Sequence, residues 1–356
     1  MKGDGMKKKN QGVALIITIT VITLLIATTM ELNRRAGDAA EFTGVTRDRL
    51  KLSHLTSSGI HMAMALLVKD KNDGEVDSLQ EDWADKETVT DLMGDIPFPE
   101  GTLAVEIQDE LSKIQVNALV KFPDGRDFNQ DQMNMWERFV GYITSGENED
   151  DDTSASAIVN SIKDWLDSGD DDLITGVNGA ESDYYKDLEP PYTCRNSPML
   201  YVDELLQVKG VAKLVESVGG WEMLSQYVTV YGMETQTTGN KFTFPGKINI
   251  NTAELPVIAA LLQLNDLPLA QEIVGYREEM TDGNYTHDLS NPNWYKNAPG
   301  CGSLEIAPNL ITTKSDFFRI RATGEMGNVK VTTTAMVQRE NKSGKNTCRV
   351  LSWQTE

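Results

Sequence analysis

Apolar residues divide the chain into a long N-terminal helix and a folded remainder. An uncharged apolar run extends from Val13 to Met30 and is interrupted only by Thr. A run of this length can just span a bilayer as a helix. From Met30 to Val68 the chain contains no Pro, and apolar residues are interleaved with charged ones at helical spacing. The pattern predicts one continuous helix over residues 13–68, with a transmembrane part over residues 13–30.

Charges next to the apolar run predict its orientation. Lys7, Lys8 and Lys9 immediately precede it, and positively charged flanks stay on the cytoplasmic side of a membrane. The N-terminus is therefore expected in the cytoplasm and the rest of the chain outside it. A cleaved signal peptide is the alternative, but the run is longer than a usual apolar signal region and no Ala-x-Ala site follows it.

The region after the helix begins with strand-like alternation and continues with helical spacing. Residues 103–110 and 112–120 alternate apolar and polar side chains, which predicts two strands joined by a turn near Glu110. Residues 130–143 and 155–166 have helical spacing instead. The segment from 122 to about 244 is therefore expected to be mainly helical.

The C-terminal part returns to strands after two further helices. Helices are expected over 254–264 and 269–279, and strands over 317–322, 330–339 and 347–353. This order predicts an α+β fold in which the long transmembrane helix, residues 13–70, packs on an antiparallel sheet. The sheet domain would comprise residues 71–121 and 246–356, and residues 122–245 would form a large, mainly helical insertion domain.

Charge narrows the function classes. The 356 residues include 54 Asp and Glu against 33 Lys and Arg, a net charge of −21. Nucleic-acid binding depends on clustered cations, so this balance disfavours it and favours small cations as partners. Residues 248–277 resemble a helix-hairpin-helix, which leaves a membrane-anchored DNA-uptake protein as an alternative. Its phosphate-binding glycine hairpin is replaced by residues 263–268, and Leu255, Ile258, Leu261 and Leu262 suit core packing.

The most acidic segment, residues 147–189, contains fourteen carboxylates and two Lys. A solvated acidic loop is the default interpretation of such a run, and the EF-hand pattern is not matched. Gly169, Gly176 and Gly179 would nevertheless let the loop fold back so that several oxygens converge, as calcium requires. The predicted calcium ligands are Asp164, Asp167, Asp170, Asp172, Glu181 and Asp183. A secreted, calcium-stabilised hydrolase is one class of protein compatible with this site.

Three cysteines occur in the chain, and the last two are the first candidates for a disulfide. In an oxidising compartment Cys301 and Cys348 could pair. Pairing of Cys194 with either of them, or independent buried thiols, are the alternatives. The sequence contains no phosphate loop, nucleophile elbow, His-Glu-x-x-His or CxxC motif, so we expect no enzymatic activity.

The N-terminus resembles that of type IV prepilins and pseudopilins. A short basic leader ends in Gly12 and is followed by an apolar helix that continues into a folded domain. The resemblance implies that prepilin peptidase removes residues 1–12 after Gly12 and that the new N-terminal residue, Val13, is methylated. Most pilins carry Glu as the fifth mature residue, whereas this chain has Ile17. A subunit with no neighbour above it needs no such Glu, and the minor pseudopilin K family resembles this chain in lacking it.

Several phrases extend this resemblance to the C-terminus. VEIQDELSKIQVNAL, DWLDSGDDD, GAESDYYKDLEPPY, KININTAELPVIAALL and FFRIRATGE are similar to protein K of the general, or type II, secretion pathway. The family implies a single-pass inner-membrane protein with a periplasmic domain. It would cap the pseudopilus tip and help start its assembly with minor pseudopilins I and J, with H as a further candidate. The resemblance also implies calcium in the helical domain, with Asp167, Glu181 and Asp183 in the matching phrases.

Overall fold

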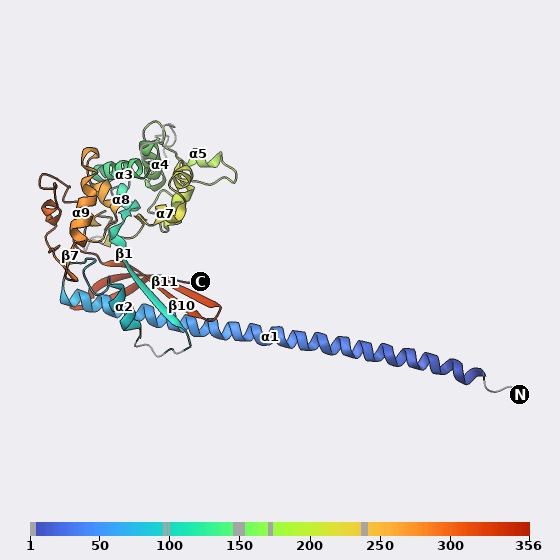
Figure 1. The fold of residues 1–356 in the computed structure, drawn as a ribbon. Coiled ribbons are helices and arrows are strands. Elements are labelled where there is room, and N and C mark those ends of the chain that lie inside the picture. The colour runs from blue at the N-terminus through green and yellow to red at the C-terminus, as the bar shows by residue number, and fades with distance from the viewer. Residues whose placement is uncertain (1–4, 95–97, 99, 145–153, 170–173, 236–240) are drawn as a thin grey trace.

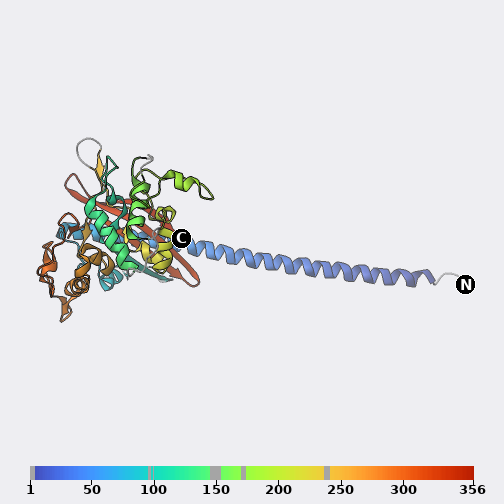
Figure 2. The same ribbon diagram turned by 90° about the horizontal axis from the view of Figure 1, so that it is seen from above.

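The first element of the structure is a single helix of 69 residues, α1 (Gly5–Asp73). The computed structural model describes residues 5–94, 98, 100–144, 154–169, 174–235 and 241–356. The N-terminal part of α1 extends away from the rest of the protein, whereas its C-terminal part lies against the sheet (Figure 1; Figure 2). The first fully buried side chain of α1 is Leu52, and Ile60 and Leu67 follow it into the core. The prediction of one continuous helix over residues 13–68 is confirmed.

Within the described residues, α1 is the one helix long and apolar enough to cross a membrane. None of its most apolar stretch is buried inside the protein. Exposed apolar side chains over this length are costly in water and stable in a hydrocarbon environment. The apolar run is therefore available to a bilayer or to other helices.

A four-stranded antiparallel sheet covers one side of the C-terminal half of α1. Its order is β1, β10, β11, β12, and the register pairs Val105 with Ala322 and Ile320 with Ala335. Alternate residues of the central strands face α1 and are buried with Ile60 and Leu67. The strands span β1 (Thr102–Asp109), β10 (Phe317–Met326), β11 (Val329–Lys342) and β12 (Lys345–Thr355). The three predicted C-terminal strands and the α+β class are confirmed.

The predicted hairpin after residue 102 is wrong in its second strand. β1 pairs with β10, and the chain then turns through η1 (Glu110–Ser112) into β2 (Ile114–Gln115), which pairs in parallel with β3 (Val228–Thr229). Apolar and polar residues from 114 to 119 are buried alike. Asn117 shows why, because its side-chain amide donates to the backbone carbonyls of Met199 and Val230. The alternation therefore marked a core segment with satisfied polar groups rather than a half-exposed strand.

The second lobe of the molecule is mainly helical and has its own core. The helices predicted over 130–143 and 155–166 are confirmed as α3 and α4, and those predicted near 254–264 and 269–279 as α8 and α9. Its helices are α3 (Gln130–Ile143), α4 (Ala155–Leu166), α5 (Ser182–Lys186), η3 (Val202–Gln207), α6 (Val211–Ser217), α7 (Trp221–Ser225), α8 (Leu255–Leu261), η4 (Leu264–Asp266), α9 (Leu269–Glu278) and η5 (Trp294–Asn297). Short strand pairs complete it: β4 (Glu234–Thr235) with β5 (Phe242–Thr243), β6 (Ile248–Asn249) with β9 (Ile311–Thr312), and β7 (Met280–Thr281) with β8 (Asn284–Tyr285).

The helical lobe is larger than the predicted insertion domain. One continuous buried cluster extends from Ile114 to Ile311, so the apolar side chains buried between residues 246 and 311 belong to the core of the helical lobe. Gly246 lies at the middle of this packing, because its backbone contacts the side chains of Ala118 and Gln132. The segment resembling a helix-hairpin-helix belongs to the same core, with Ile258 and Leu262 buried. It is a structural helical pair in the described structure.

Polar side chains join the two lobes at the end of β1. Asp109 is buried and accepts hydrogen bonds from Asn249 Nδ2 at 2.8 Å and Thr252 Oγ1 at 2.6 Å. The backbone carbonyl of Asp77, in the loop between α1 and α2 (Lys86–Gly94), also accepts from Asn249 Nδ2. The helical lobe is therefore fixed near the end of α1 that lies opposite the N-terminus (Figure 1).

The predicted disulfide between Cys301 and Cys348 is corrected by the structure. All three cysteines are free. Cys301 is buried in the core of the helical lobe, whereas Cys348 packs against the core between α1 and the sheet. Cys194 is buried in the helical lobe, where its Sγ contacts the carbonyl of Ala180. The thiols of Cys301 and Cys348 lie in different lobes, which excludes the short separation that a disulfide requires.

Candidate metal centre

Helix α4 positions the first two candidate ligands. Ser154 caps the helix by accepting a hydrogen bond from the backbone N–H of Ala157. Ile158 and Ile162 lie on the apolar face of α4 in the core of the helical lobe. Asp164 lies in the last turn of this anchored helix, and Asp167 is its C-cap residue. Both carboxylates therefore have a rigid support.

Three carboxylates converge at this end of α4. Asp164, Asp167 and Glu181 each place one carboxylate oxygen within 4.8 Å of the others. Their exposed fractions are 0%, 6% and 7%. Glu181 reaches the cluster from the residue before α5. Oxygens that share one calcium ion at about 2.4 Å lie at most about 4.8 Å apart, so this geometry can hold such an ion.

The loop between α4 and α5 passes close to Asp164. Both carboxylate oxygens of Asp164 lie 3.2 Å from the backbone nitrogen of Thr175, which donates to them. A Cβ atom on Gly179 would lie 2.1 Å from Asp164 Oδ2 and 2.6 Å from the carbonyl oxygen of Thr175. Only glycine allows this approach, so Gly179 keeps the backbone close around the carboxylate.

The electrostatics of the cluster favour a cation. Burial raises the pKa of Asp164 above its ordinary value, partly offset by the hydrogen bonds from Thr175. Lys163 pairs with Asp167 at 2.5 Å, which neutralises one of the three carboxylates. Hard oxygen donors with excess negative charge are the ligands that calcium prefers. The described residues therefore fit a calcium ion in their chemistry and spacing, and they supply three of the roughly six to eight oxygen ligands that calcium takes.

The structure groups three of the predicted ligands and separates one. Asp164, Asp167 and Glu181 lie together. Asp183 is corrected: its side chain is 88% exposed and pairs with Lys186 at 2.9 Å, because the first turn of α5 directs it to solvent. Asp170 and Asp172 lie outside the described residues, so their role as ligands stays a prediction.

A second group of carboxylates, not predicted from the sequence, lies where α1 ends. Asp70, Asp77 and Glu81 place oxygens within 4.8 Å of one another. Arg339 from β11 donates to Asp70 Oδ2 at 2.9 Å and also to Asp77. The guanidinium already supplies the positive charge at this position, which makes this an ion-pair cluster. Asp70 and Asp77 are 269 and 262 residues away from Arg339 in the sequence, so local sequence gave no signal for this cluster.

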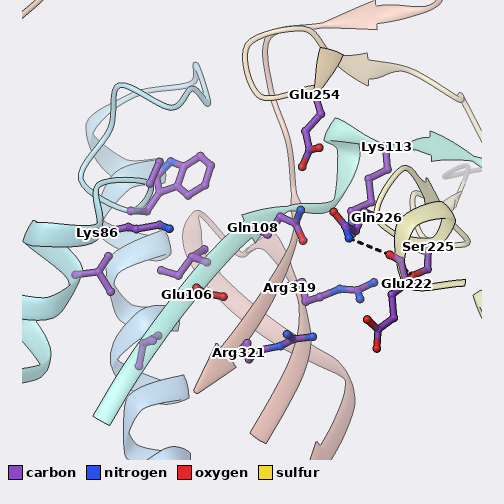
Figure 3. A pocket seen from close by; sticks show the side chains of 15 residues that line it. Lys86, Glu106, Gln108, Lys113, Glu222, Ser225, Gln226, Glu254, Arg319 and Arg321 are labelled. Carbon is purple, nitrogen blue, oxygen red and sulfur yellow. Dashed lines mark hydrogen bonds between the residues drawn. The ribbon is translucent and has the colours of Figure 1, made fainter. Parts of the chain in front are cut away.

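A cleft of about 690 Å³ separates the outer side of β1 from the helical lobe. Lys86 lies on one side of the strand, and Arg319 and Arg321 on the other (Figure 3). Its lining residues include neither His nor Cys, so they form no pair of nucleophile and His base.

A buried ion triad lies at the wall of this cleft. Glu110 is fully buried, and its carboxylate accepts from Lys113 at 3.1 Å and from Arg319 at 2.7 Å. Burial alone would raise the pKa of Glu110, but these two cations outweigh burial and hold the pKa below its ordinary value. Through Glu110 and Lys113, the triad joins the start of the helical lobe to Arg319 of β10.

Known proteins resemble this chain along much of its length. Type II secretion system protein K of Aeromonas hydrophila is 27% identical over 58% of this chain and 60% of that protein. Protein K of Pseudomonas aeruginosa is 26% identical over 76% of this chain and 74% of its own length. Residues 112–233 also match the model of the family described as type II secretion system, protein K. The chain is therefore similar to the protein K family, over residues 112–233 for the family model and over 58% to 76% of its length for these relatives.

The protein K match covers the candidate metal centre, because Asp164, Asp167 and Glu181 all lie within residues 112–233. A solved structure resembles the fold of nearly the whole chain. It is the complex of GspK, GspI and GspJ from the type 2 secretion system of enterotoxigenic Escherichia coli. The TM-score is 0.59 at 18% identity, over 87% of this chain and 99% of the matched one. The long helix and the antiparallel sheet with a helical lobe are thus the fold of a solved secretion-system protein.

Proposed function

We propose that this protein is a non-enzymatic minor pseudopilin that caps the tip of a periplasmic pseudopilus and helps to start its assembly. One observation carries the proposal. The helical lobe lies beside the end of α1 that is remote from the N-terminus and extends well beyond the sheet (Figure 1; Figure 2). A subunit stacked above this one would have to occupy the same space. The protein would therefore end a helical array and not continue it.

The N-terminal half of α1 supports membrane anchoring in this proposal. Residues 13–30 are apolar, exposed and long enough to span a bilayer. With the lysines that precede this run on the cytoplasmic side, the N-terminus would lie in the cytoplasm and the two lobes in the periplasm, with the inner membrane between them. Cleavage after Gly12 and methylation of Val13 would be the processing steps. Ile17 at the fifth mature position suits a subunit that needs no carboxylate to meet a neighbour's amino group.

Minor pseudopilins I and J are the proposed partners, and H is a further candidate. The matched GspK chain comes from a complex that contains GspI and GspJ. Between the apolar run and the sheet, α1 exposes Leu32, Phe42 and Leu50, with Phe42 74% exposed. Apolar side chains at such positions favour packing against neighbouring helices. The partners would therefore contact α1 below the sheet.

Calcium is the proposed ligand of the acidic loop. Asp164, Asp167 and Glu181 would hold the ion and so connect the end of α4 to the start of α5. The ion would supply two further positive charges to a group of three buried carboxylates, of which Asp167 already pairs with Lys163. Its role would be to keep this part of the helical lobe folded.

Co-expression of the full chain with the I and J proteins of its own secretion system tests the proposal. We expect a stable ternary complex in detergent and loss of protein export when the gene is deleted. The variant Phe42→Asp places a charge in the proposed helix contact and should weaken the complex without altering the melting of the isolated chain. The exposed variant Thr43→Asp is the control. A complex that forms equally well without this chain, together with unchanged export, would contradict the proposal.

A further inference from the structure

Lys163 precedes the first candidate ligand in the sequence and contacts the second. Its Nζ lies 2.5 Å from Asp167 Oδ2. The two side chains are 12% and 9% exposed, so the pair is largely shielded from water. The other oxygen, Asp167 Oδ1, accepts a hydrogen bond from the backbone N–H of Gly169 at 3.2 Å. Both oxygens of this candidate ligand are therefore already engaged within the chain.

An ammonium group in this position supplies charge where calcium would supply it. Three buried carboxylates need a counter-charge, and Lys163 provides one positive charge. Calcium provides two and binds carboxylate oxygens at about 2.4 Å. An ion bound to Asp167 would be repelled by an ammonium hydrogen-bonded to the same carboxylate. The ion and the ammonium therefore compete for Asp167.

The structure offers Lys163 a second favourable position. Its Nζ lies 5.8 Å from the centre of the Phe128 ring, within the range of a cation–π contact. The flexible four-carbon stem of lysine can turn the ammonium towards the ring and away from the carboxylate. An ammonium that moves away from Asp167 would therefore still have a partner, the Phe128 ring.

We propose that Lys163 is a tethered competitor of the divalent cation. Its ammonium neutralises Asp167 when no calcium is bound and moves towards Phe128 when calcium takes its place. This inference rests on the proposed calcium site. The ammonium of Lys163 would keep the acidic loop folded when calcium is absent. It would also weaken calcium binding, towards the dissociation constants of about 10⁻⁴–10⁻³ M that are typical of extracellular calcium modules. The site would then fill only where free calcium is high.

The test compares Lys163→Met with wild type in the full chain in detergent. Methionine is unbranched, only one atom shorter than lysine and similar in helix propensity, but it carries no charge. We expect K163M to bind calcium about tenfold more tightly in a calorimetric titration with CaCl₂. In EDTA it should melt below wild type, because its carboxylates have lost their counter-charge. In saturating calcium this order of melting temperatures should reverse.

The variant Lys186→Met is the matched control. It removes the same charge from an exposed pair with Asp183, so calcium affinity should change less than about twofold. Calcium binding by wild type with an unchanged affinity in K163M would overturn the competition and leave the calcium site intact. If neither protein binds calcium, the calcium site fails and so does the inference. If, in addition, K163M melts below wild type in EDTA and K186M does not, Lys163 is a permanent counter-charge and not a competitor.

Discussion

Arg319 Nη2 of strand β10 lies 2.7 Å from Glu110 Oε1, and this contact ties the first residue after β1 to the sheet. The same carboxylate accepts from Lys113 and from Thr229 Oγ1 of the helical lobe. One buried carboxylate thus satisfies three donors that belong to two lobes. Neutralising this carboxylate should therefore lower the stability of the protein far more than neutralising the exposed charges around it.

The variant Glu110→Gln should be strongly destabilised. It leaves Lys113 buried and Arg319 partly buried without a counter-charge, and breaking a buried ion pair from one side costs about 3–5 kcal/mol. We expect a loss of about 3 kcal/mol in the free energy of unfolding, measured by chemical denaturation. Glu106→Gln, on the exposed face of β1, should change it by less than about 0.5 kcal/mol. Equal stability of both variants would show that the triad does not hold the lobes together.

The ion-pair cluster at the end of α1 predicts that stability depends on pH. Burial raises the pKa of Glu81 to about 7 and that of Asp70 to about 6. The folded state therefore holds protons that the unfolded state has released, and the free energy of unfolding should rise as pH falls from about 7 towards 4.5. Glu81→Gln keeps an oxygen acceptor for Ser78 and Trp83 but cannot titrate, so it should make this slope shallower and leave the part that Asp70 contributes.

Glu75→Gln is the control for the pH experiment. Glu75 lies in the same loop and is fully exposed, and its ion pair with Lys314 holds its pKa below the ordinary value. The slope between pH 7 and 5 should therefore be unchanged in this variant. A slope as steep in Glu81→Gln as in wild type would show that Glu81 is not one of the titrating groups.

Much of the fold could be predicted because its signals are local. The apolar run in α1 and the helical spacing of Trp136 and Phe139 in α3 each reflect the environment of one element. The strand after Glu110 was misread because Gln115 and Asn117 are polar yet buried, and their partners lie far along the chain. The alternation of residue types cannot distinguish such a segment from a half-exposed strand.

The candidate site was predicted only in part, because only some of its residues are brought together by local structure. Asp164 and Asp167 lie in the last turn and at the C-cap of an amphipathic helix with a clear end, so their convergence is a local property. Asp183 lies only two residues after Glu181, yet the first turn of α5 directs its side chain to solvent. Arg339 and its carboxylates meet only through the fold of the sheet. From the sequence alone, neither the exposure of Asp183 nor the burial of the Arg339 cluster can be told from the behaviour of an ordinary surface charge.

Neutralising Asp164 and neutralising Asp183 should have different effects on stabilisation by calcium. Asp164→Asn removes a buried ligand and should abolish calcium-dependent stabilisation. Asp183→Asn removes an exposed charge and should keep it. At about one hundred times the dissociation constant, calcium should raise the free energy of unfolding by about 2.7 kcal/mol in wild type and in D183N. Thermal melting with and without EDTA measures the difference, and equal losses in both variants would contradict the ligand set.

Gly179→Ala should disturb the site without removing any ligand. The new Cβ would lie 2.1 Å from Asp164 Oδ2, so the loop must shift, at a cost of about 1–3 kcal/mol. Calcium affinity should fall with the stability of the helical lobe. Gly141→Ala is the control, because a Cβ there meets no atom within 4 Å and alanine favours the helix α3. G141A should be as stable as wild type or more so.

The N-terminal mass of the protein isolated from its native membrane tests the central claim most directly. A pseudopilin is cut by prepilin peptidase before it is assembled, so the account predicts a membrane-bound chain that begins at a methylated Val13. A chain that keeps Met1 in the membrane would contradict it. A soluble form cut after residue 30 would do so as well.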